Sequence, residues 1–181
     1  GAAPRAVRLV RRLFDQRGIG IELGRRVVGC DDEGPSSLIL DDGLRWPCDL
    51  AIWATGAAPP EVLRQFDLPK SERGFLLVRP TLQSTASVSV FVVGDAADWP
   101  SQHVPKAGVY AVRQGPVLWH NLRCWMAGEP LQNYEPQRGF LSLLSCADGT
   151  AILDYRGFAV RSRWAWWLKL AIDRQFVQRF R

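Results

Sequence analysis

One run of residues constrains the fold more than any other part of this 181-residue chain. Residues Val90–Val93 form a hydrophobic stretch rich in β-branched side chains, and it stops at Gly94 and Asp95. This pattern is typical of a buried parallel strand whose carboxyl end faces a ligand, because α/β sheets bind ligands at that edge. Gly94 lets a ligand approach the backbone, and the Asp95 carboxylate accepts hydrogen bonds from hydroxyl groups. Taken alone, Gly-Asp more often caps a strand and begins a turn.

Two neighbouring segments favour the ligand-binding interpretation. Residues 49–57 repeat the pattern, because their hydrophobic run closes on Thr55 and Gly56. Residues 104–115 follow soon after the first run, and there a proline precedes a helix that begins with small residues. Together the three segments predict a ligand site at strand ends and at the start of a helix.

In this order and spacing, the three segments resemble the pyridine nucleotide-disulfide oxidoreductase superfamily. The resemblance runs from about Arg5 to the end of the chain. Residues 105–118, with the sequence PKAGVYAVRQGPVL, are most similar to type II NADH dehydrogenases and sulfide:quinone reductases. They are especially similar to the flavoprotein module found fused to selenide, water dikinase, which hints at selenium metabolism.

The resemblance implies a partial FAD/NAD(P)-binding fold of the α/β class, Rossmann-like and of the two-dinucleotide-binding-domain type. Residues 1–58 would be the C-terminal half of the NAD(P)-binding domain, and residues 59–130 the C-terminal part of the FAD-binding domain. Residues 131–181 would add a small antiparallel β-hairpin and an amphipathic, Trp-rich C-terminal helix. The intact enzyme would transfer a hydride from NAD(P)H to FAD and on to an acceptor such as a quinone.

The resemblance also implies the cofactor-binding residues. Gly94 and Asp95 would bind the ribityl and pyrophosphate region of FAD, while Ala107 and Gly108 present backbone N–H groups to the flavin ring. Lys106 would add a positive charge there, or would simply be a surface lysine. Thr55 and Gly56 would shape the crossover between the domains. We nominate no catalytic side chain, since the cofactors themselves carry hydride transfer.

The glycine-rich turns of this superfamily are absent from the chain. Two Gly-x-Gly-x-x-Gly turns are expected, one for each dinucleotide, yet Gly18 and Gly20 are not followed by the third glycine. We interpret Gly18 as the C-cap of the first helix. The chain is therefore expected to be the C-terminal half of a larger enzyme, and its activity to need the missing N-terminal half.

Composition excludes several other classes of protein. The net charge of +5 is spread along the chain, and nothing before residue 156 provides the basic stripe with stacking aromatics expected of a nucleic-acid-binding protein. The four cysteines show neither a C-x-x-C motif nor metal-ligand spacing, so we expect no redox disulfide, no metal site and a reducing, cytoplasmic environment. Arginines interrupt the N-terminal apolar face, so no signal peptide is expected.

Periodicity predicts the remaining elements. Helices are expected at residues 4–16, 61–66 and 106–126, and strands at 19–22, 25–29, 38–40, 49–53 and 75–78. A turn at 41–43 should join two strands of a hairpin. The tail should form a small antiparallel sheet from residues 140–144, 151–154 and 157–160.

A basic, Trp-rich helix is expected after residue 160. Its aromatic and aliphatic face consists of Trp164, Trp167, Leu168, Ala171, Ile172 and Phe176. It is too short in uncharged residues to span a bilayer. It could lie on the inner face of the membrane as a peripheral contact, pair with another subunit in a homo-oligomer, or pack against the flavin domain.

Three functions remain open on the sequence. The first is the FAD-dependent NAD(P)H oxidoreductase described above. The second is a sulfide:quinone reductase-like flavoprotein, which would need a pair of cysteines flanking the flavin. The third is a non-catalytic binding or oligomerisation module.

Overall fold

The computed structural model describes residues 2–31 and 36–178, which form two compact units. Unit 1 consists of Gly1–Trp53 with Gly139–Arg181, and unit 2 is Ala54–Arg138. Within the described residues, no helix is both long enough and apolar enough to cross a membrane.

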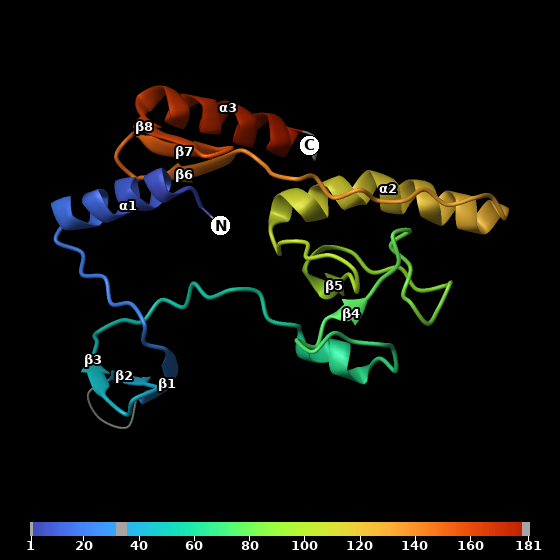
Figure 1. Cartoon of the computed structure of the whole chain (residues 1–181), viewed down its shortest axis with the longest axis horizontal. Helices are drawn as coiled ribbons and strands as arrows, with labels where there is room; N and C mark the ends of the chain where they lie inside the picture. The colour runs from blue at the N-terminus through green and yellow to red at the C-terminus, as the bar shows by residue number, and fades with distance from the viewer. Residues whose placement is uncertain (1, 32–35, 179–181) are drawn as a thin grey trace. The chain divides into compact units, whose positions relative to one another are not determined.

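Unit 1 contains a three-layer arrangement of helix, sheet and helix (Figure 1). The sheet is antiparallel, with strands β6 (Ser142–Ser145), β7 (Ala151–Tyr155) and β8 (Phe158–Ser162) in that order. Helix α1 (Pro4–Gln16) packs on one face and helix α3 (Arg163–Gln178) on the other. Successive residues of a strand point to opposite faces. The antiparallel sheet and the helix predicted for the tail are thus confirmed.

Strand β7 packs against α1 with one face and against α3 with the other. Ile152 is buried in a cluster with Ala6 and Leu13 of α1, whereas its neighbours Ala151 and Leu153 are buried with Ala165 of α3. A strand buried on both faces reads as a continuous apolar run, which is the pattern of residues 151–153. This sheet therefore joins the beginning of the chain to its end.

Helix α1 begins and ends where the sequence predicts. A proline occupies its first turn, where its missing N–H is not needed. The helix ends before Gly18, whose φ of +66° is the left-handed conformation that glycine favours. The N–H of Ile19 donates to the carbonyl of Phe14 over 2.9 Å, which closes the last turn. The C-cap residue itself is Arg17, one position before the predicted Gly18, and Gly18 is the left-handed residue that follows the cap.

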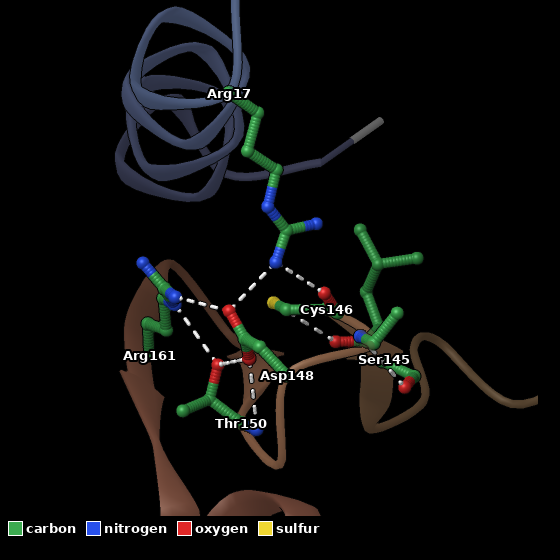
Figure 2. Close-up of polar contacts among 8 residues, drawn as sticks. Arg17, Ser145, Cys146, Asp148, Thr150 and Arg161 are labelled. Carbon is green, nitrogen blue, oxygen red and sulfur yellow. Dashed lines mark hydrogen bonds and ion pairs between the residues drawn. The ribbon is translucent and has the colours of Figure 1, made fainter.

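An ion-pair network fastens the end of α1 to the β6–β7 turn (Figure 2). The Asp148 carboxylate accepts hydrogen bonds from Arg17 over 2.7 Å and from Arg161 over 2.6 Å. Arg17 also donates to the carbonyl of Cys146 over 2.7 Å, and Thr150 donates to Asp148 through both its hydroxyl and its backbone N–H. The hydrogen bond from the Thr150 hydroxyl, helped by Arg161, lowers the pKa of Asp148 to about 2.

A second antiparallel sheet in unit 1 contains β1 (Val27–Asp31), β2 (Ser37–Leu40) and β3 (Arg45–Pro47). The predicted turn at 41–43 joins β2 to β3, and Gly43 adopts the positive φ of +82° that the turn requires. Two predicted strands are wrong. Residues 19–22 and 49–53 form no strand, and Leu50 and Ile52 are 77% and 83% exposed. No described strand pairs with either segment, so neither has a ladder of hydrogen bonds to hold it extended.

Unit 2 is built around the long helix α2 (Gly108–Ala127) and little regular sheet. A short 3₁₀ helix, η1 (Glu61–Gln65), lies where a helix was predicted. Two-residue strands β4 (Leu76–Leu77) and β5 (Ala97–Asp98) pair in parallel, so the predicted strand at 75–78 is present but short. The core of the unit gathers Phe75, Val78 and Leu82, each at most 1% exposed.

The hydrophobic run at Val90–Val93 is not the buried parallel strand that its composition predicts. It makes one isolated antiparallel bridge, between Phe91 and Gln83. The backbone then turns at Gly94, with φ of +65°, into the 3₁₀ helix η2 (Gly94–Ala96). Parallel pairing begins only afterwards, at Ala97, so the Gly-Asp pair precedes a strand instead of ending one.

Candidate cofactor site

Four of the seven predicted site residues come together in unit 2. Gly94 and Asp95 of η2 line one crevice with Lys106 and Ala107, which immediately precede α2. Gly108, the first residue of α2, follows them in the chain but does not line the crevice. The N–H of Gly94 donates to the side-chain oxygen of Gln114, two turns into α2. A Cβ atom on Gly94 would lie 3.5 Å from the Cβ of Ala111, so the turn and the helix are in close contact. The convergence of these two elements is the geometry on which a cofactor site depends.

The N-terminus of α2 is open to a ligand. Its N-cap, Ala107, is extended and makes no side-chain capping bond, and no acidic residue lies in the first turn. The N–H of Ala107 donates to the carbonyl of Pro105 over 3.0 Å, so the available N–H groups begin at Gly108. Gly108 is exposed, and a Cβ atom there would meet nothing within 4 Å. This end of the helix carries a partial positive charge that attracts negative charge.

Asp95 and Lys106 differ in exposure and in their contacts. The Asp95 residue is exposed beside the helix start. The Lys106 side chain is only 10% exposed; its ammonium donates to the carbonyl of Ala97, pairs with Asp98 over 3.3 Å and lies 4.1 Å from the ring centre of Phe75. Lys106 thus fastens the start of α2 to β5.

The two pKa values of this buried pair have separate causes. Burial lowers the pKa of Lys106 and outweighs the opposing effect of Asp98. Burial raises the pKa of Asp98, but the nearby Ser71 hydroxyl and the charges of Lys106 and Arg73 outweigh it, so the pKa of Asp98 is lowered. Asp98 therefore stays ionised and holds two basic side chains.

Thr55 and Gly56 lie away from this crevice. Both are exposed in a segment without regular secondary structure, and neither is among the residues that line the crevice. The strand that would carry them to a sheet edge does not form.

The sequence interpretation missed the polar residues that position the site. Gln114 and Asn121 are 1% and 0% exposed on α2. Asn121 donates to the carbonyls of Thr81 and Gln132 over 2.9 and 2.8 Å and accepts from the N–H of Gln132 over 2.8 Å. A signal was present, because the two residues are seven positions apart and so share one helix face. Polar residues at that spacing on a packed helix are candidates for buried hydrogen bonds.

FAD cannot enter the crevice itself. The crevice between Gly94 and α2 is too narrow for a water molecule, since side chains of both elements pack there. A ligand would therefore have to lie outside the crevice, on the side where Asp95 and Gly108 are exposed residues. A hydroxyl-bearing chain next to a ring that gains negative charge suits these two groups.

Comparison with known proteins identifies the family. The model of the pyridine nucleotide-disulphide oxidoreductase family matches residues 2–115. The chain is 27% identical over 124 residues to the type II NADH:quinone oxidoreductase of Haemophilus influenzae, covering 66% of this chain and 27% of that protein. It is 29% identical over 103 residues to an internal alternative NAD(P)H-ubiquinone oxidoreductase of Arabidopsis thaliana, covering 55% of this chain and 20% of the relative.

Solved structures share the fold. A water-forming NADH oxidase from Lactobacillus brevis superposes with a TM-score of 0.61 at 19% identity, over 84% of this chain and 34% of that one. An FAD-dependent pyridine nucleotide-disulphide oxidoreductase from Desulfovibrio vulgaris gives a TM-score of 0.62 at 20% identity, over 84% of this chain and 38% of that one. The chain thus has a partial FAD/NAD(P)-binding fold.

The chain spans about a fifth to a quarter of the length of these two curated relatives. The family match, in contrast, extends over well more than half of the chain and includes η2 and the start of α2. Both elements of the crevice therefore lie within the matched region. This chain belongs to the pyridine nucleotide-disulphide oxidoreductase family.

Proposed function

We propose that this chain is part of an FAD-dependent enzyme that passes a hydride from NAD(P)H to FAD and on to a quinone. The family membership supports the oxidoreductase class, and the printed names of two relatives, a NADH:quinone and a NAD(P)H-ubiquinone oxidoreductase, support the acceptor. The observation that carries the proposal is the closeness of Asp95 to the open N-terminus of α2. FAD, when bound, supplies the hydride-accepting ring.

The residues of this chain would bind and orient the cofactor. Asp95 would accept hydrogen bonds from the ribityl hydroxyls, and the N–H of Gly108 would face the pyrimidine edge of the ring. The positive end of α2 would stabilise the negative charge that reduction places there. Gln114 would act indirectly, because it holds the N–H of Gly94 and so fixes the turn that carries Asp95.

Titration of the protein with FAD, followed by flavin fluorescence, tests the site. Asp95→Ala should weaken FAD binding about tenfold or more, since a hydrogen bond to a charged group contributes about 1.5–3 kcal/mol. Asp67→Ala is the matched control, because Asp67 is an exposed aspartate of the same unit. Equal affinity in both variants, or no FAD binding by the protein expressed from its gene, would refute the proposed site. NADH oxidation with a soluble ubiquinone analogue then tests the acceptor.

A sulfide:quinone reductase is the weaker candidate. Cys124 lies sixteen residues along α2 from Gly108, which corresponds to about 24 Å along the helix axis. Burial, together with the neighbouring Glu129, raises the pKa of Cys124 and keeps its thiol protonated, whereas a reactive cysteine needs the thiolate. Cys124→Ser should therefore leave quinone reduction unchanged.

The exposed tryptophans of helix α3 suggest where the enzyme would bind a membrane quinone. Ala165, Trp166 and Leu168 pack on the sheet, whereas Trp164 and Trp167 are 55% and 57% exposed. Tryptophans beside basic residues suit a membrane interface. We therefore propose peripheral membrane contact through α3, at the surface where a lipid-soluble acceptor resides. A link to selenium metabolism, suggested by the resemblance to the module fused to selenide, water dikinase, stays a prediction.

Co-sedimentation with vesicles containing phosphatidylglycerol tests the membrane contact. The double variant Trp164→Ser with Trp167→Ser should abolish it, while Trp119→Ser, at a 65% exposed tryptophan of α2, should not. If the α3 variant instead dissolves a dimer and leaves vesicle binding intact, α3 is an oligomer contact. That result would favour the third candidate, an oligomerisation module.

A further inference from the structure

An apolar groove in unit 1 is separate from the cofactor site. Val7, Val10 and Phe14 of α1 form one wall, and Leu144 and Ile152 of the sheet form its floor. Its cavity volume is about 340 Å³, which lies within the range of sites that bind small ligands.

The groove exists because the sheet covers only part of the apolar arc of α1. Ala6 and Leu13 are buried against the sheet, where α1 packs mainly on β7 and β8. Val7, farther round the helix, remains 41% exposed, and Leu144 on the edge strand β6 is 53% exposed. Two apolar surfaces thus face the same space without filling it. An apolar ligand in that space would remove both from water.

The lining of the groove includes one positively charged side chain, that of Arg11. Arg11 lines it together with the apolar wall, since Arg11 follows Val7 by four positions on α1 and precedes Phe14 by three. Among residues 2–31 and 36–178, no hydrogen bond or ion pair engages the Arg11 guanidinium. Asp154, the acidic residue that lines the groove, accepts the N–H of Ala3 over 2.9 Å. The guanidinium is therefore available to an anionic group of a ligand.

We propose that this groove binds an anionic amphiphile, namely a single acyl chain that ends in a carboxylate. The chain would lie against Val7, Val10 and Leu144, and the carboxylate would accept paired hydrogen bonds from Arg11. A neutral amphiphile would leave the guanidinium without a partner. The apolar face of a second copy would bury that charge unpaired, which is costly. The charge of Arg11 thus favours a carboxylate ligand over both other occupants.

Calorimetric titration of the 181-residue chain with decanoate, and separately with 1-decanol, tests the proposal. Decanoate should bind more tightly than decanol, although the two chains are equally long. Arg11→Gln should weaken decanoate binding about tenfold or more and leave decanol binding unchanged. Arg8→Gln is the matched control, because Arg8 is exposed on the same helix and does not line the groove. Leu144→Ser, at an exposed floor position, should weaken both ligands.

Methyl NMR spectra give a readout that does not depend on affinity. Decanoate should shift the methyl signals of Val7, Val10 and Leu144 and leave those of Val112 on α2 in place. Equal loss of decanoate binding in Arg11→Gln and Arg8→Gln would mean diffuse charge attraction and would overturn the proposal. It is also overturned if neither ligand binds, or if sedimentation shows a dimer that Leu144→Ser dissolves and decanoate does not.

Discussion

Replacement of Lys106 by methionine tests whether this side chain stabilises unit 2. Methionine keeps most of the apolar stem but removes the charge that lies between Asp98 and Phe75. Both members of the pair are buried, at 10% and 11% side-chain exposure. Loss of one partner of a buried ion pair costs about 3–5 kcal/mol. Arg73, 3.3 Å from Asp98, remains as a second partner, so we expect a smaller loss, about 2–3 kcal/mol of unfolding free energy.

Urea unfolding followed by tryptophan fluorescence measures this loss. Lys70→Met is the control, because it removes a half-buried lysine of the same unit whose ammonium donates only to the carbonyls of Phe66 and Leu68 among the described residues; its cost should stay below that of Lys106→Met, at about 1 kcal/mol. The double variant Asp98→Asn with Lys106→Met should cost less than the sum of the single variants. Additive costs, or equal costs for Lys106→Met and Lys70→Met, would show that the pair does not hold α2 to β5.

The pH dependence of stability gives a second check on the same pair. The pKa of Asp98 in the folded protein lies below its unfolded value of 3.8. Its contribution is therefore complete above that value and is lost as the pH falls through the lower, folded pKa. Lys106→Met removes one of the charges that lower this pKa, so the variant should lose less stability on acidification than the wild-type protein.

Three further predictions concern the packing of both units. Asn121→Ala removes three hydrogen bonds between a fully buried side-chain amide and the backbone, and should cost about 2–4 kcal/mol in urea unfolding, whereas the exposed Asn133→Ala should cost almost nothing; similar costs would contradict the role of the amide. The pKa of Asp148 is about 2 in the folded protein and 3.8 in the unfolded chain, so its ion pairs with Arg17 and Arg161 stabilise the fold fully above about pH 4 and lose this contribution towards pH 2. In Asp148→Asn, this acid dependence of the unfolding free energy should disappear. Gly18→Ala should destabilise by about 1 kcal/mol because of its positive φ, and a thermal melt without any loss of stability would refute this.

Local chemistry explains which elements could be predicted. Helix α1 is bounded by Pro4 and Gly18, and α2 ends at Gly128 in the left-handed conformation, so both ends follow from residues that restrict or free the backbone. The hairpin turn at 41–43 and the three strands of the tail follow in the same way from turn residues and alternation. These signals act over a few residues and need no distant partner.

Local sequence signals fix these helices and hairpins, and the family resemblance anticipates that Gly94 and Asp95 meet the start of α2. The remaining features depend on tertiary contacts. The tertiary structure left residues 49–53 and Val90–Val93 without parallel neighbours, because a strand forms only where another strand supplies its hydrogen bonds. It also turned Lys106 towards Asp98 and buried Gln114 and Asn121, since contacts between residues far apart in the chain, and not local preference, fix where a polar side chain finds its partner.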